Sequence, residues 1–79
     1  MTNLEKYNQI FTEVFSVDES QLRAEFDNQH VDGWDSVRQL GLTTAIEDAF
    51  DIMLDAGDII EFNSYEKGKA ILAKYEIEF

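Results

Sequence analysis

Residues 35–51 read DSVRQLGLTTAIEDAFD, and this stretch decides the fold. Asp35 is a good N-cap, because its short acidic side chain can accept a hydrogen bond from the first helical turn. Apolar residues then recur at helical intervals, which predicts a helix from about Ser36 to Phe50. The side of this helix expected to face the core carries Leu42, Ile46, Ala49, Phe50 and Met53.

The opposite side of the same helix is apolar in its N-terminal half and acidic in its C-terminal half. An apolar spot rimmed by like charge is typical of a docking surface for another protein. The acids lie toward the helix C-terminus, where the dipole disfavours anions, so we interpret them as serving an electrostatic encounter. The alternatives are that the acids are merely solvated and that the first loop covers the apolar half. The residues on this side are Val37, Leu40, Thr44, Glu47, Asp48 and Asp51.

A first helix is predicted upstream, over about residues 3–15. Thr2 and Glu5 have the spacing of a capping box, and apolar residues follow at helical intervals. Between residues 16 and 34 the periodicity weakens, and a short turn of helix is expected within residues 20–26. A connection of this length is unusual in a compact domain and indicates either function or a span between distant elements.

Two further helices are predicted after residue 50. Residues 55–58, DAGD, break the helical pattern, and the apolar residues that follow suggest a short third helix. Ser64 can cap a fourth helix, and the tail from residue 76 is expected to be frayed. The chain is therefore expected to form one all-α domain over residues 1–79, a small bundle of three long helices and one short one with a long first loop.

The charge of the chain excludes several classes of partner. It has 17 acidic and 6 basic residues and a formal net charge of −11. Such a surface repels nucleic acid and anionic membranes, whereas it attracts proteins with Lys/Arg patches. With no cysteine, disulfides and thiolate metal sites are excluded, and any thiol chemistry needs a prosthetic group. Since no signal peptide or membrane-length apolar run is found, we expect a soluble cytoplasmic protein without membrane insertion.

Three stretches of the sequence resemble the acyl carrier protein family, which includes the peptidyl carriers. Residues 33–36, GWDS, resemble the signature of carriers associated with peptide, aminoacyl and secondary-metabolite assembly. Residues 46–52, IEDAFDI, and residues 63–67, NSYEK, are similar to later segments of the family. The motif around the serine is weak by itself, but the three stretches together are specific, because they follow the order and spacing of the family.

The resemblance implies a discrete, monomeric carrier protein with an acyl-carrier-like bundle and no catalytic residues of its own. Ser36 would accept 4′-phosphopantetheine covalently from coenzyme A through a separate, magnesium-dependent phosphopantetheinyl transferase, with Asp35 as motif residue and helix cap. Loading and processing enzymes with basic docking patches would then use acyl, aminoacyl or peptidyl thioesters on this arm. The mixed side of the second helix matches the partner-facing positions of the family. Residues implied to line the space between helices, where some relatives shelter an acyl chain, are Ile46, Phe50, Ile59, Phe62 and Leu72.

Several positions depart from the pattern of the family. Val37 replaces the usual leucine after the serine, and Arg38 is a cation where acidic or neutral residues are common in fatty-acid carriers. Gly41 lies in mid-helix, where it costs about 1 kcal/mol relative to alanine, and Thr44 is more polar than the usual residue. These departures favour a specialised biosynthetic pathway, and acyl, aminoacyl and peptidyl cargoes all stay open.

Other functions find less support in the sequence. His30, the only histidine, falls in a polar loop and is expected to be solvated rather than catalytic. Residues 55–61, DAGDIIE, lack the alternation and length of an EF-hand loop, so no metal site is predicted. The main alternative is an acidic helical adaptor that docks basic partners without a prosthetic group. It shares the fold and differs only at Ser36.

Overall fold

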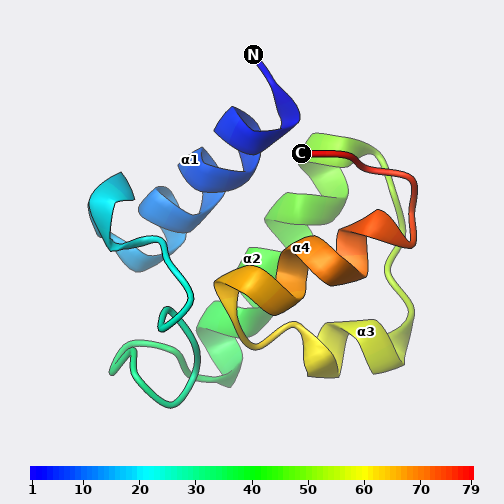
Figure 1. Cartoon of the computed structure of the whole chain (residues 1–79). Coiled ribbons are helices and arrows are strands. Elements are labelled where there is room, and N and C mark those ends of the chain that lie inside the picture. The colour runs from blue at the N-terminus through cyan, green and yellow to red at the C-terminus, as the bar shows by residue number, and fades with distance from the viewer.

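Four α-helices and a single 3-10 turn make up the computed structural model, which describes all 79 residues. In Figure 1, α1 lies beside α2, α4 crosses α2, and the short α3 lies at one end of the bundle. The predicted all-α bundle with a long first loop is therefore confirmed. The elements are α1 (Asn3–Phe15), η1 (Glu19–Gln21), α2 (Ser36–Phe50), α3 (Ala56–Glu61) and α4 (Tyr65–Ala73).

Side-chain caps define the starts of the three longer helices, as predicted. At α1, the Thr2 hydroxyl accepts the Glu5 N–H at 3.1 Å while the Glu5 carboxylate accepts the Thr2 N–H at 2.9 Å. At α2, Asp35 accepts the Arg38 N–H at 2.8 Å. At α4, Ser64 accepts an N–H of the first turn at 2.9 Å. These bonds satisfy backbone donors that lack partners within a helix.

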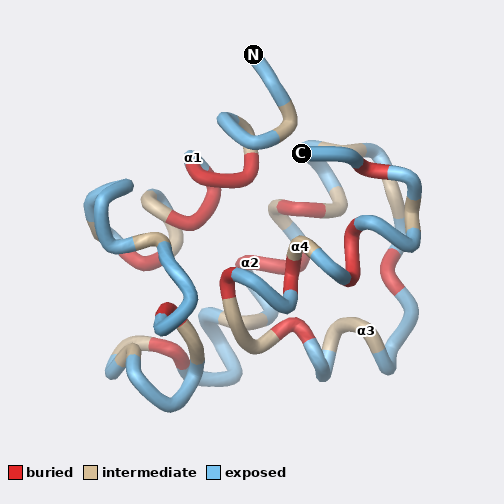
Figure 2. Tube along the Cα trace, in the orientation of Figure 1, coloured by how far each residue is buried: buried red, intermediate tan, exposed pale blue.

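The core is formed where the inward faces of α1, α2 and α4 meet, as the buried segments in Figure 2 show. Aromatic rings dominate it on the side of the first loop. Phe11 of α1 packs against Phe26 and Trp34 of that loop, with ring centroids 5.9 and 6.0 Å apart. The largest fully buried side chains are Tyr7, Phe11, Phe62, Leu42, Ile46 and Leu72.

The first loop is held to the opposite end of the chain. The Phe26 carbonyl accepts the Tyr65 N–H at 2.8 Å, and the Asn28 N–H donates to the Asn63 carbonyl at 2.9 Å. The helical turn expected within residues 20–26 is shorter and earlier, because it covers only Glu19–Gln21. The loop spans from α1 to the start of α2 while pairing with the start of α4, which accounts for its length.

The buried stripe of α2 differs from the predicted one. Leu42 and Ile46 are buried, as predicted, but Phe50 is only half-buried, Ala49 is exposed and Met53 is 84% exposed. The helix ends when Asp51 adopts a left-handed conformation (φ 54°), so the helical spacing no longer applies at Met53.

Two further expectations about the C-terminal third are wrong. Asp55 is the N-cap residue of α3 and residues 56–58 form its first turn, so this stretch begins the helix instead of breaking it. The tail is packed rather than frayed, because Glu76 (φ 66°) turns the chain back. Ile77 is consequently buried, and the ring centroid of Phe79 lies 5.0 Å from that of Tyr7.

Candidate functional site

Ser36 is the first residue of α2 and is exposed. The Asp35 side chain is occupied by the Arg38 N–H, and its backbone carbonyl accepts the Gln39 N–H at 2.9 Å. The backbone N–H groups of Ser36 and Val37, in contrast, have no partner within the chain. The serine hydroxyl therefore lies beside two free donors at the positive end of a helix of 15 residues.

The loop before Ser36 is anchored by Trp34. Its indole is buried between α1 and the loop, with its ring centroid 4.7 Å from that of Phe15 and 5.9 Å from that of Phe26. Two residues later the chain has returned to the surface and α2 has begun. This buried anchor fixes where the chain reaches the surface, and the exposed Ser36 follows two residues later.

No side chain of this protein is hydrogen-bonded to the Ser36 hydroxyl as a base. His30 lies in the first loop, and its Nδ1 is 2.7 Å from Asp27 Oδ1. The hydrogen bond from His30 holds the pKa of Asp27 below its usual value. A transfer onto Ser36 therefore requires a base from another molecule, while this chain supplies the hydroxyl, the helix dipole and the free N–H groups.

The predicted partner-facing residues of α2 differ in how far their side chains are exposed to solvent. Val37 and Leu40 are 76% and 59% exposed, so the first loop does not cover them. Thr44, Asp48 and Asp51 are exposed as well. Glu47 is half-buried instead, and its Oε2 accepts the backbone N–H of Leu54 at 2.8 Å. Its carboxylate therefore supports the turn after α2, which makes it a poorer candidate for contact with a partner.

Ile60 of α3 is a further exposed apolar residue near the start of α2, and it was not predicted as a surface residue. Its side chain is 73% exposed, and its carbonyl is hydrogen-bonded to Gln39 of α2 at 3.1 Å. The adjacent Ile59 is half-buried against the core. Consecutive residues of a helix point about 100° apart, so the Ile-Ile pair was itself a signal that one of the two faces solvent.

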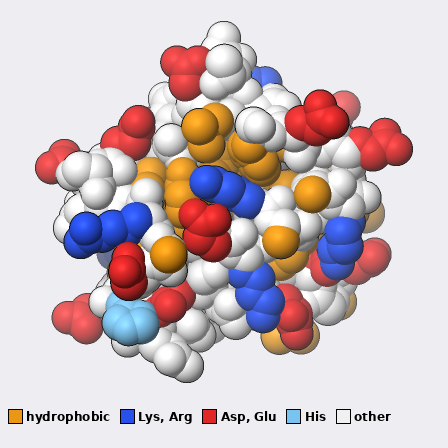
Figure 3. Space-filling view, in the orientation of Figure 1, with side chains coloured by type: hydrophobic (Ala, Val, Ile, Leu, Met, Phe, Trp, Pro, Cys, Tyr) orange, Lys and Arg blue, Asp and Glu red, His pale blue; other side chains and the backbone are white.

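Arg38 is the one Lys or Arg side chain with neither an acidic partner nor an aromatic ring. Ion pairs engage Arg23, Lys67, Lys69 and Lys74, and Lys6 lies 5.7 Å from the Phe50 ring centroid. Figure 3 shows the resulting pattern on one face, where basic side chains lie next to acids. The guanidinium of Arg38 folds back toward Gly33. The start of α2 thus carries a free positive charge on an otherwise acidic protein.

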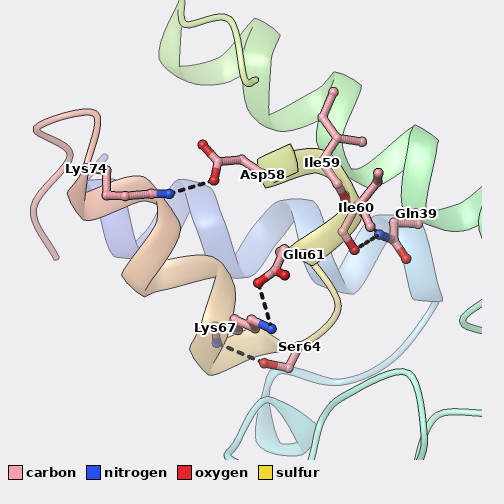
Figure 4. A network of polar contacts seen from close by, with 8 residues as sticks. All are labelled: Gln39, Asp58, Ile59, Ile60, Glu61, Ser64, Lys67 and Lys74. Carbon is pink, nitrogen blue, oxygen red and sulfur yellow. Dashed lines mark hydrogen bonds and ion pairs between the residues drawn. The ribbon is translucent and has the colours of Figure 1, made fainter. Parts of the chain in front are cut away.

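The short helix α3 is attached to its neighbours by polar contacts (Figure 4). Asp58 accepts hydrogen bonds from Lys74 Nζ and from the Tyr75 hydroxyl, each at 2.6 Å. Glu61 pairs with Lys67 at 3.1 Å. The bond from Lys74 holds the pKa of Asp58 below its usual value, and Asp58 raises the pKa of both Lys74 and Tyr75. Asp58 thus joins α3 to the end of α4.

Asp58→Asn is expected to lower the melting temperature by a few degrees at pH 7. The folded-state pKa of Asp58 lies below the unfolded value, so its stabilisation is full above about pH 4 and is lost as pH falls through the folded pKa. The difference between the two proteins should therefore shrink below about pH 4. Thermal unfolding by circular dichroism between pH 3 and 7 measures it. A difference that is constant over this range would contradict the assignment.

The five residues that the family resemblance implies to line a space for an acyl chain differ in how deeply they are buried. Ile46, Phe62 and Leu72 are packed in the core, while Phe50 and Ile59 are half-buried at its edge. The one hollow in the surface, of about 370 Å³, lies in the first loop instead. Its lining residues are Val17, Gln21, Arg23, Glu25, Phe26, His30, Val31 and Asp32.

The helices of this protein are too short or too polar to cross a membrane, and the longest, α2, has 15 residues. Comparison of the chain with protein-family models gives no match, and comparison with curated proteins gives none either. The function must therefore be inferred from features of the chain itself. These are an exposed serine at a capped helix start, exposed apolar residues beside it and a strongly acidic composition.

Proposed function

We propose that this protein is a carrier of the acyl carrier protein family and that Ser36 is its attachment point for 4′-phosphopantetheine. The observation that carries the proposal is the exposed Ser36 hydroxyl at the start of a 15-residue helix, beside two unpartnered backbone N–H groups. When attached, the arm would supply a thiol that holds acyl, aminoacyl or peptidyl groups as thioesters.

The attachment would consume coenzyme A and leave a phosphodiester on Ser36. The serine oxygen attacks the phosphorus that bears pantetheine, the bond from that phosphorus to the adenosine bisphosphate portion breaks, and 3′,5′-ADP leaves. The proton of the hydroxyl passes to a base on the transferase, because no base of this chain is bonded to Ser36. The free N–H groups of Ser36 and Val37 suit the new anionic group, since a helix N-terminus favours negative charge.

Incubation with coenzyme A and a broad-specificity phosphopantetheinyl transferase tests the proposal. The intact mass should rise by about 340 Da, the mass of the arm, and the added mass should map to the peptide that contains Ser36. Failure to gain mass with several transferases that are active on other carriers would refute the carrier function. The acidic adaptor would then be the better description of this fold and charge.

Asp48→Lys is expected to slow association with the transferase and later processing enzymes. Asp48 is exposed on α2 and its charge is free to attract a basic patch, unlike that of Glu47. At low salt we expect kcat/KM to fall roughly two- to fivefold, and the difference should disappear near 0.5 M salt, where screening is strong. Glu13→Lys on α1 makes the same change in net charge and is the control. Equal effects of both variants would show that only net charge matters.

A further inference from the structure

Gln39 joins three segments of the chain that meet beside Ser36. Its side-chain amide donates to the carbonyl of Ile59 at 2.8 Å and to that of Ile60 at 3.1 Å, the contacts to α3 shown in Figure 4. Its oxygen accepts the indole N–H of Trp34 at 3.3 Å. One amide on the first turns of α2 thus holds both the anchored loop before Ser36 and two carbonyls in the last turn of α3, where few carbonyls have a partner within the helix.

The other polar attachments of α3 do not lead to α2. None of its six residues is fully buried, and only Ile59 and Asp58 are half-buried. Its polar side chains Asp58 and Glu61 are bonded to α4 and to the residues that follow it, not to α2. Gln39 is the one side chain of α2 that is hydrogen-bonded to α3. The position of α3 against the N-terminal half of α2 therefore depends on this residue.

We propose that Gln39 is a positioning residue that sets α3 beside the start of α2. Ile60, Val37 and Leu40, which are each more than half exposed, would then form one apolar docking surface beside Ser36. The inference rests on the proposed carrier function, because the occupant of this surface is the transferase that modifies Ser36. A surface that is already ordered before the partner arrives loses less conformational entropy on binding, so Gln39 contributes to affinity without touching the partner.

Steady-state kinetics with coenzyme A and a broad-specificity transferase test this role. Gln39→Leu keeps the size of the side chain but removes its hydrogen bonds. We expect the KM for the carrier to rise roughly five- to tenfold, the factor that corresponds to about one net hydrogen bond. We expect kcat to stay within about twofold, because Ser36 and its Asp35 cap are unchanged. Gln9→Leu, at an exposed glutamine of α1, is the matched control and should leave both constants unchanged.

A double-mutant cycle with Ile60→Ala separates positioning from a general loss of stability. If Gln39 acts by placing Ile60, then Gln39→Leu should change KM less than about twofold once Ile60 is alanine. Effects on KM that simply add, or a KM that Gln39→Leu leaves unchanged, would overturn the proposal.

Hydrogen exchange measured by NMR on the unmodified protein gives a readout that needs no transferase. Gln39→Leu should accelerate the exchange of α3 amides several-fold, while amides in the middle of α1 keep the wild-type rate and show that the variant is folded. Unchanged α3 exchange would overturn the proposal. If the wild-type chain accepts no arm, the carrier function is refuted, and the exchange rates alone then decide whether Gln39 positions α3.

Discussion

Ser36→Ala is expected to abolish the gain of about 340 Da completely, because the arm needs the serine oxygen for its phosphodiester bond. The variant should remain folded. Ser36 is exposed, and the Asp35 side chain, not the serine, caps α2. A surface substitution of this kind changes the free energy of unfolding by no more than about 0.5 kcal/mol. Intact-mass measurement after incubation with the transferase, together with thermal unfolding, checks both expectations.

Ser20→Ala is the matched control for this experiment. Ser20 is also exposed, but it lies in the η1 turn of the first loop, without a long helix behind it. The Ser20→Ala variant should gain the full mass of the phosphopantetheine arm at the same rate as the wild-type protein. Modification of the Ser36→Ala variant would place the attachment at another residue, and loss of modification in the Ser20→Ala variant as well would show that the effect is not specific to Ser36.

Gly68→Ala is expected to destabilise the fold by about 3 kcal/mol or more, because it overpacks the core. Gly68 is buried in α4, where an added methyl carbon would overlap the Tyr7 hydroxyl and lie 2.6 Å from a ring carbon of Phe62. The Tyr7 hydroxyl cannot easily move, since it donates to the Tyr65 carbonyl at 2.7 Å. Domains of 79 residues have a total stability of about 4–12 kcal/mol, so the loss is a large fraction.

Gly41→Ala is the matched substitution, with the opposite expected sign. Gly41 lies in the middle of α2, is exposed, and has no neighbouring atom within 4 Å of an added methyl carbon. The added methyl group meets no steric clash, and alanine has a higher helix propensity than glycine. The variant should therefore be more stable than the wild type by about 0.5–1 kcal/mol. Urea unfolding of both variants measures the difference. A Gly68→Ala protein as stable as Gly41→Ala would refute the close packing of α1 against α4.

Local signals in the sequence were sufficient to predict the boundaries of the two longest helices. Thr2 with Glu5, and Asp35, are capping residues followed by apolar periodicity, and α1 and α2 begin and end at the predicted residues. The same kind of signal failed at residues 55–58. Asp55 is the N-cap residue of α3, but its side chain makes no capping hydrogen bond. Residues of this kind occur both between helices and in the first turn of a helix, so the sequence did not distinguish the two.

Solvent exposure on α2 was only partly predictable, because a helical wheel does not show which neighbours reach each side. Val37 and Leu40 lie on the exposed side, as expected, while Ala49 and Met53 do not reach the core. Glu47 was predicted to supply charge to the partner-facing side of α2. Its bond to Leu54 arises only because the chain turns back after α2, and the residue pattern does not reveal this turn.

The sequence alone determined that residue 36 is a serine at the start of a capped helix and that the protein around it is strongly acidic. Both follow from local chemistry: an N-cap, a helical period and a count of charges. Only the tertiary structure decided that Trp34 anchors the loop before Ser36, that Gln39 binds α3, and that Ile60 lies near the start of α2. These contacts join residues up to 23 positions apart, such as Phe11 and Trp34, and they form only when the buried core brings the helices together.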